Sequence, residues 1–116
     1  DDIAAQSRQY RTDIPNMEDP LEALAVKFAN MDNCTLLYDR DKKRVDYIIN
    51  EAKENGAKGV IVLMTKFCDP EEYDYPIVKK DLEQAGIPEL YIEVEQQSVN
   101  VEQIRTKIQT FADIIA

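Results

Sequence analysis

The sequence predicts an α/β fold in which a parallel sheet carries helices on both faces. Two apolar, β-branched runs typical of strands, 59–67 and 89–95, alternate with amphipathic patterns typical of helices. This alternation favours parallel strands joined by right-handed crossovers. A chain of 116 residues with 44% apolar side chains is long enough for one compact domain, and a single domain over 1–116 is therefore expected.

Three stretches have the period of amphipathic helices. The first begins at Asp19, an expected N-cap followed by proline, the second spans 41–55 before Gly56, and the third spans 101–115. Their apolar positions recur at spacings of three and four: Leu21, Leu24, Ala25 and Phe28; Val45, Ile48, Ile49 and Ala52; Val101, Ile104, Ile108, Phe111 and Ile115. We expect the third stripe to be buried against the sheet.

The strands differ in pattern. The run GVIVLMTKF at 59–67 is apolar almost throughout, which is typical of a central strand, whereas ELYIEVE at 89–95 alternates like a strand nearer an edge. CTLLY at 34–38 is a candidate short extra strand. Together these elements predict a doubly wound layer of the flavodoxin-like or Rossmann-like kind. The abrupt start of the sequence suggests a fragment of a larger subunit.

A further helix is expected between the two strands. Asp69 is its predicted N-cap, since Pro70 and Glu72 follow at capping-box positions. Pro76 is then expected to begin the main helix, which runs to Gly86.

Composition excludes several function classes. Fourteen basic and twenty-three acidic side chains give a net charge of -9, which disfavours binding to nucleic acid or to an anionic membrane. No apolar run approaches the roughly 18 to 20 residues of a membrane span, so a soluble, cytoplasmic protein is expected. Histidine is absent, and the two cysteines, Cys34 and Cys68, suffice neither for a typical zinc site nor for a disulfide framework.

Cys68 lies where parallel sheets bind ligands, directly after the first strand. A helix N-terminus and Lys66 would favour its thiolate, whereas Asp69 and the two glutamates that follow Pro70 oppose it. Two interpretations stay open at this point: a small buried apolar residue, or a ligand that acts with groups from elsewhere. The absence of histidine argues against a papain-like nucleophile. The acid pair Glu93 and Glu95 is explained more simply by a solvated face than by acid and base catalysis.

The segment GVIVLMTKFCDPEEYDYPIVKKDLEQAGIPELYIEVEQQ, followed by EQIRTKIQTFADII, resembles the C-terminal region of the 2-hydroxyacyl-CoA dehydratase subunits, relatives of the ATP-dependent benzoyl-CoA reductases. The pieces KFCDPEEYDYP, AGIP and QIRTK, in this order, carry the resemblance over most of the chain. The start is similar to the family's Asp pair and Gly-Ser-Arg-aromatic run, although Gln6 replaces the glycine. The matching residues there are Asp1, Asp2, Ser7, Arg8 and Tyr10.

The resemblance implies a C-terminal domain of a longer iron-sulfur subunit. In that family three cysteines hold a 4Fe-4S cluster, and Cys68 matches the third, so two further ligands are expected outside this segment; Cys34 would be structural. The implied partners are a second dehydratase subunit in a heterodimer, an ATP-hydrolysing activator protein and a CoA thioester. The activator would supply an electron that yields a ketyl radical anion, from which a 2-hydroxyacyl-CoA loses water to give an enoyl-CoA.

The resemblance assigns no catalytic residue. Six side chains are expected near substrate or cluster: Lys66, Glu95, Gln97, Arg105, Ser7 and Arg8. Two alternatives stay open, a benzoyl-CoA reductase-type subunit and a noncatalytic flavodoxin-like module that binds a protein, and the 116 residues alone are expected to be inactive. A ligand role requires an accessible Cys68 sulfur, whereas an inert thiol would be buried among Ile61, Leu63 and helix side chains.

Overall fold

The computed structural model describes residues 12–31, 40–95 and 101–116. Their contacts form two units, Asp1–Arg44 and Val45–Ala116. The first unit contains helix α2. The second contains most of helix α3 and all of β1, α4, β2 and α5. The elements are α2 (Pro20–Ala29), α3 (Lys43–Glu54), β1 (Val60–Thr65), α4 (Asp69–Gln84), β2 (Glu89–Val94) and α5 (Val101–Ile115).

Helix α2 begins as predicted. The carboxylate of Asp19 accepts a hydrogen bond of 2.8 Å from the N–H of Leu21, and Pro20 occupies the first helical position. Within its unit only Ala23 of the helix is buried, while Leu21 and Phe28 are exposed. No helix among the described residues is both long and apolar enough to cross a membrane.

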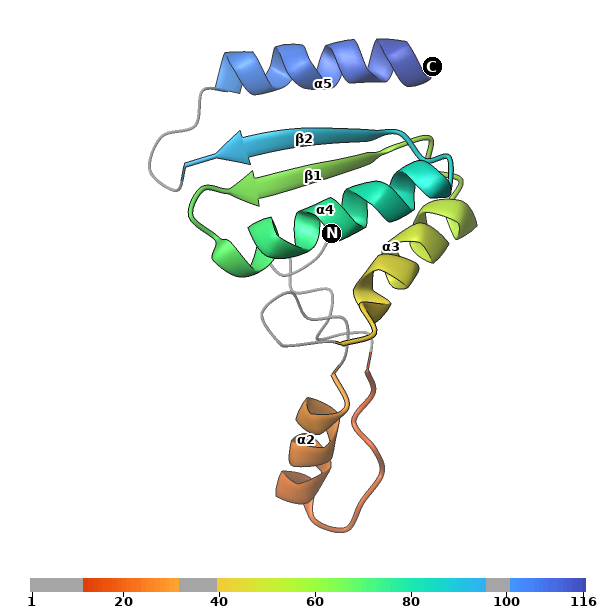
Figure 1. Ribbon diagram of the computed structural model, residues 1–116. Helices are drawn as coiled ribbons and strands as arrows, with labels where there is room; N and C mark the ends of the chain where they lie inside the picture. The colour runs from red at the N-terminus through yellow and green to blue at the C-terminus, as the bar shows by residue number, and fades with distance from the viewer. Residues whose placement is uncertain (1–11, 32–39, 96–100) are drawn as a thin grey trace. The chain divides into compact units, whose positions relative to one another are not determined.

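Strands β1 and β2 are parallel neighbours, which confirms the predicted α/β class. Their register runs from Val60 opposite Glu89 to Thr65 opposite Val94. Side chains alternate across the sheet, so Val60, Val62 and Met64 share one face with Tyr91, whereas Ile61 and Leu63 share the other with Ile92. Helices α3 and α4 cover the first face and α5 lies on the second, over β2 (Figure 1).

The main core lies between α3, α4 and the sheet. Val45 of α3 packs with Val78 and Leu82 of α4, and Ile48, Ile49, Val60 and Ile87 surround them. Burial of Val45 and Ala52 agrees with the predicted stripe of this helix. The largest fully buried side chains are Met64, Leu82 and Ile92.

The start of α4 differs from the prediction. Cys68, and not Asp69, is the N-cap, and the helix runs from Asp69 to Gln84 without a break at Pro76. Pro76 removes one hydrogen bond, which would have joined its N–H to the carbonyl of Glu72. The helix continues because contacts on both sides of the proline hold it, Tyr75 against Tyr91 and Val78 in the core.

Helix α5 is less buried than its apolar stripe predicts. Val101 and Ile108 are exposed, and Ile104, Phe111 and Ile115 are only half-buried. A Cβ atom on Gly59 would come within 2.7 Å of the Phe111 ring, so the helix approaches the backbone closely there. The helix lies over β2 and leaves Ile61 and Leu63 of β1 exposed on the same face, so the described sheet covers only part of the stripe.

Tyr75 and Glu89 form a polar contact beneath α4. The Tyr75 hydroxyl donates a hydrogen bond of 2.7 Å to Oε1 of Glu89, and the Tyr75 ring lies 4.6 Å, centroid to centroid, from that of Tyr91. The Glu89 side chain is only 10% exposed, and among the described residues its Oε2 has no hydrogen-bond partner. Burial, and then the hydrogen bond to Glu89, raise the pKa of Tyr75 above its ordinary value.

Replacing Leu82 by alanine is expected to lower the free energy of unfolding by about 2 to 5 kcal/mol, because this fully buried side chain leaves a cavity between α3 and α4. Urea denaturation measures the change. Ile114→Ala on α5 is the matched control, since Ile114 is exposed and its truncation removes little packing. Equal effects of the two substitutions would contradict this account of the core.

Stability is expected to fall as the pH rises above 10.0, the ordinary pKa of tyrosine. The folded protein holds the Tyr75 proton more tightly than the unfolded chain, so the unfolded chain loses it first and unfolding becomes easier. Tyr75→Phe should flatten this alkaline loss, while costing about 1 to 3 kcal/mol at neutral pH because Glu89 loses its donor. Denaturation midpoints between pH 8 and pH 11 test this, with the exposed Tyr73→Phe as control.

Candidate functional site

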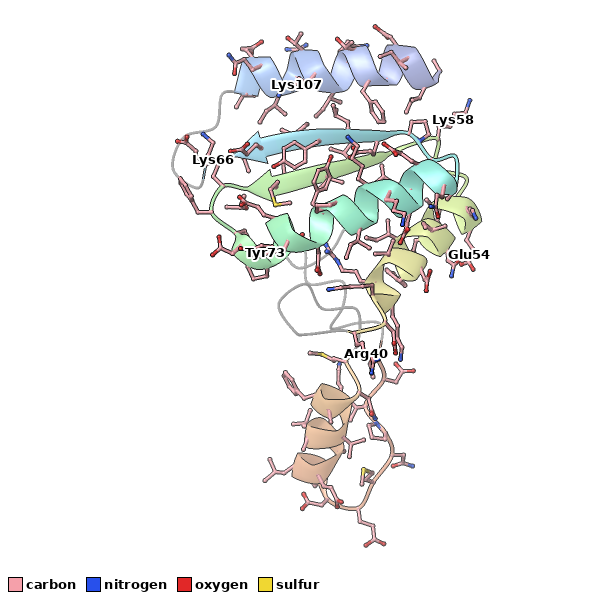
Figure 2. All side chains as sticks on the ribbon, viewed as in Figure 1. Arg40, Glu54, Lys58, Lys66, Tyr73 and Lys107 are labelled. Atoms are coloured by element: carbon pink, nitrogen blue, oxygen red, sulfur yellow. The ribbon has the colours of Figure 1, made fainter. Side chains whose placement is uncertain are left out.

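The candidate site is the edge of the sheet where both strands end. Because β1 and β2 are parallel, the segments that leave their carboxyl ends meet at this edge. Lys66, Phe67 and Cys68 leave β1 there, and Glu95 leaves β2. Figure 2 shows Lys66 and Tyr73 at this end of the unit, opposite the end with Glu54 and Lys58.

A tight turn from Thr65 to Cys68 joins β1 to α4. The N–H of Cys68 donates to the carbonyl of Thr65 at 3.1 Å, and Phe67 inside the turn has a left-handed φ of 66°. This conformation is rare for a bulky side chain. The Phe67 N–H donates to Oε1 of Glu72 at 3.2 Å, which ties the turn to the helix, and the Phe67 ring is 90% exposed. Sequence patterns did not identify Phe67, since only the turn geometry reveals it.

Cys68 is a free, half-exposed thiol at the N-cap of α4. Its side chain makes no capping hydrogen bond, while its carbonyl accepts the N–H of Glu72 at 3.0 Å. Ile61 and Leu63 are exposed, so the sulfur is not buried among them as an inert core thiol would be. The thiol therefore lies, partly accessible, beside the N–H groups that begin α4.

Cys68 alone does not make a metal site. In the part of the chain that the structure describes, no group of three or more His, Cys, Asp or Glu side chains could hold a metal ion. A metal ion bound at Cys68 would therefore need ligands from beyond the described residues.

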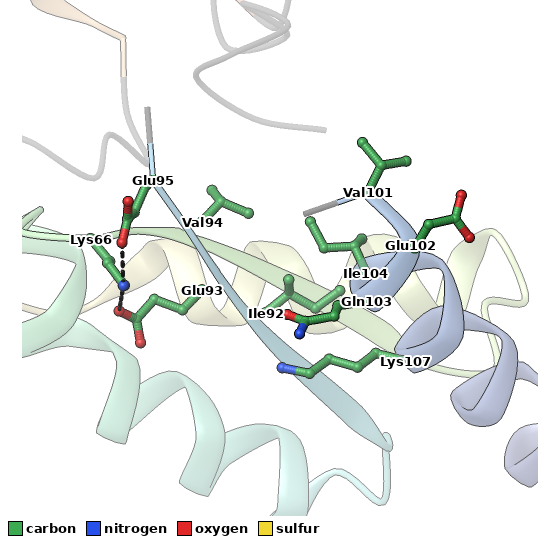
Figure 3. A pocket seen from close by; sticks show the side chains of 10 residues that line it. All are labelled: Lys66, Ile92, Glu93, Val94, Glu95, Val101, Glu102, Gln103, Ile104 and Lys107. Carbon is green, nitrogen blue, oxygen red and sulfur yellow. Dashed lines mark hydrogen bonds and ion pairs between the residues drawn. The ribbon is translucent and has the colours of Figure 1, made fainter. Parts of the chain in front are cut away.

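Lys66 is held by the carboxylate of Glu93 in β2 and by that of Glu95, the residue after β2. Its Nζ lies 2.6 Å from Oε1 of Glu95 and 3.9 Å from Oε1 of Glu93 (Figure 3). The hydrogen bond to Glu95 is the main reason that the pKa of Lys66 is raised above its ordinary value. The parallel register explains the pair, since one step beyond Thr65 and Val94 it sets Lys66 opposite Glu95. Glu93 is thus an ion-pair partner of Lys66. The alternating pattern of residues 89–95 suggested only a solvated face and did not reveal this contact.

A cavity of about 680 Å³ opens between the end of β2 and the first turns of α5 (Figure 3). Ile92 and Val94 of β2 and Val101 and Ile104 of α5 give the cavity apolar walls, and charged side chains also line it. Lys107 points across it toward β2 and has no ion pair with another described residue. Its lining is Lys66, Ile92, Glu93, Val94, Glu95, Val101, Glu102, Gln103, Ile104 and Lys107.

Three of the predicted site residues meet at the carboxyl edge: Cys68, Lys66 and Glu95. Arg105 is exposed on α5 and does not line the cavity. Ser7, Arg8 and Gln97 lie outside the described residues, as do Cys34 and the candidate strand 34–38.

Comparison with known proteins gives consistent matches. The family model described as 2-hydroxyglutaryl-CoA dehydratase, D-component, matches residues 1–115. The chain is 56% identical over 115 residues to the (R)-phenyllactyl-CoA dehydratase beta subunit of Clostridium sporogenes. This alignment covers 99% of this chain and 30% of that protein. It is 41% identical over 117 positions to the (R)-2-hydroxyglutaryl-CoA dehydratase subunit beta of Acidaminococcus fermentans, with 97% and 31% covered.

A reductase is a more distant relative. One of the benzoyl-CoA reductase subunits of Thauera aromatica is 26% identical over 117 positions, with 99% of this chain and 30% of that protein covered. The chain thus spans about 30% of the length of the curated relatives that it matches. Because the family model covers almost every residue, the chain belongs to the 2-hydroxyglutaryl-CoA dehydratase, D-component family, and the resemblance noted in its sequence is confirmed.

Proposed function

We propose that this chain is part of a beta-type subunit of a 2-hydroxyacyl-CoA dehydratase, in which Cys68 is one ligand of a 4Fe-4S cluster. The enzyme would remove water from a 2-hydroxyacyl-CoA to give an enoyl-CoA. The observation that carries the proposal is the position of Cys68, a half-exposed thiol at the sheet edge where β1 ends. The family of the chain, which is that of the dehydratases, supports it. Two further cysteines would come from outside these 116 residues.

The surroundings of Cys68 support a sulfur ligand. The N-terminus of α4 carries the positive end of the helix dipole, which stabilises a thiolate and the negative charge of a cluster. Asp69, Glu71 and Glu72 in the same turns oppose a free thiolate. The negative charge of Glu72 is partly offset, because its carboxylate accepts a hydrogen bond from the Phe67 N–H. A bound iron would compensate for the remaining repulsion, because its positive charge favours the thiolate.

The cluster, when bound, would supply one-electron chemistry that the side chains of this protein lack. The role of Cys68 is then to hold iron at the edge of the sheet. The hydrogen bonds of the Cys68 N–H and the Phe67 N–H hold the backbone of the turn Thr65–Cys68 that carries the sulfur. Lys66 brings a positive charge to the edge, but Glu95 and Glu93 pair with it, so the three side chains together are negatively charged.

The proposal includes partners. The dehydratase relatives are named as beta subunits, so we expect a second subunit in a heterodimer, with an ATP-hydrolysing activator protein that delivers the electron. A CoA thioester is the expected substrate, and Arg105 and Lys107 on α5 are exposed cations that could pair with its phosphates.

A benzoyl-CoA reductase-type subunit is the second candidate. The match to the Thauera aromatica reductase covers as much of the chain, but its identity of 26% is below the 41% and 56% of the dehydratase subunits. The dehydratase assignment is therefore favoured.

Cys68→Ala in the natural protein is expected to remove the cluster, because two remaining cysteines do not hold four irons stably. Iron and acid-labile sulfide, measured anaerobically together with the ultraviolet-visible spectrum, test this without relying on activity. We expect about four irons for each cluster before the substitution and loss of most of them after it.

Cys34→Ala is the matched control, since this second cysteine is expected to be structural and its loss should leave iron content unchanged. Circular dichroism of both variants separates cluster loss from unfolding. If Cys68→Ala keeps its iron, or if the natural protein holds none, the ligand assignment is wrong and the noncatalytic protein-binding module becomes the better interpretation.

A further inference from the structure

Phe67 combines two features that oppose stability. Its φ of 66° lies in the left-handed region, which a bulky side chain enters only at a cost in conformational energy and which glycine enters freely. Its ring is 90% exposed, so the burial of apolar surface does not offset that cost. Neither backbone preference nor packing among the described residues therefore explains a phenylalanine at this position.

The turn that carries Phe67 does not depend on the ring. Its three consecutive N–H groups all donate hydrogen bonds of 2.9 to 3.2 Å: Lys66 to Val94, Phe67 to Glu72 and Cys68 to Thr65. Because the ring takes no part in these bonds, a residue without a ring can form the same turn. A side chain that the turn does not need, held in a conformation that it disfavours, indicates a role in function.

Cys68 is the residue that follows Phe67 in this turn. Consecutive Cα atoms lie about 3.8 Å apart, so the ring and the half-exposed thiol leave the backbone at neighbouring positions of the sheet edge. Among residues 66–70, the Phe67 ring is the only large apolar side chain, since the others are lysine, cysteine, aspartate and proline. The ring is therefore the group of this turn that is suited to exclude water from whatever the sulfur binds.

We propose that the Phe67 ring covers the iron-sulfur group that Cys68 would hold and keeps water away from it. The inference rests on the proposed function, since it requires that group at Cys68. The apolar shell around a metal site controls the access of solvent and the local dielectric, and both affect the reduction potential. The left-handed φ of Phe67 is then explained, because it places a large ring where glycine would leave the sulfur open to solvent.

Phe67→Gly in the natural protein tests the proposal, because it removes the ring and relieves the left-handed φ in one step. Under anaerobic conditions we expect the variant to lose iron to a chelator on the order of 10-fold faster than the parent, because solvent reaches the site more easily. Its reduction potential should rise, since water stabilises the negative charge that reduction adds. The melting midpoint from circular dichroism should not fall, whereas removal of a ring that only stabilised the fold would lower it.

Two further variants isolate the effect of the ring. Phe67→Tyr keeps the ring and the strained backbone, so it should hold iron as the parent does. Tyr73→Ala removes another exposed ring of α4 and should leave the iron loss and the potential unchanged.

The outcomes separate this inference from the proposed function. Iron loss from Phe67→Gly at the rate of the parent would overturn the inference, and so would loss from Phe67→Tyr or Tyr73→Ala as fast as from Phe67→Gly. None of these results changes the iron content of the parent, which tests Cys68. A parent protein without iron would overturn the proposed function and this inference together.

Discussion

The parallel register of β1 and β2 is the constraint on which the rest of the second unit depends. Setting Val60 opposite Glu89 fixes which side chains share a face, and it brings the segments after both strands to one edge. A shift by one residue would move Met64 out of the core and Tyr91 away from Tyr75. The register also sets Lys66 opposite Glu95, so the same backbone pairing builds the core and the candidate site.

The candidate site is mostly acidic, like the whole protein, and Lys66 adds a positive charge there. The chain has a net charge of -9, and three acidic side chains lie in the first turn of α4 beside Cys68. Lys66 is the cation of this edge, but Glu95 and Glu93 hold it. The favourable charge nearest to the Cys68 sulfur is therefore the positive end of the α4 helix dipole, and not a neighbouring cation.

Two features of the described residues lack the groups that would complete them. The proposed ligand role of Cys68 would need companion ligands that the described residues do not supply, and Ile61 and Leu63 on β1 are apolar side chains that the described residues leave exposed. Both belong to a region that corresponds to about 30% of the length of its relatives. The cysteine is the basis of the proposed function, and the exposed ring of Phe67 beside it is the basis of the further inference.

The sequence by itself determined the type and order of the described helices and strands and the edge at which Cys68 lies. Caps and apolar periods depend on residues within a turn or two, so Asp19, Gly56 and the stripe of Val45 and Ala52 could be interpreted correctly without the fold. The segments KFCDPEEYDYP, AGIP and QIRTK likewise pointed to the family, and the comparisons confirm it. The ligand role of Cys68 is still a prediction.

Only the tertiary structure decided the features that depend on contacts between distant residues. It made Cys68 the N-cap of α4 and carried that helix through Pro76, because packing on both sides outweighs one lost hydrogen bond. It paired Lys66 with Glu95, 29 positions away, through a strand register that no local pattern encodes. It left Val101 and Ile108 exposed, since an apolar stripe specifies a helix but not where on the sheet that helix will lie.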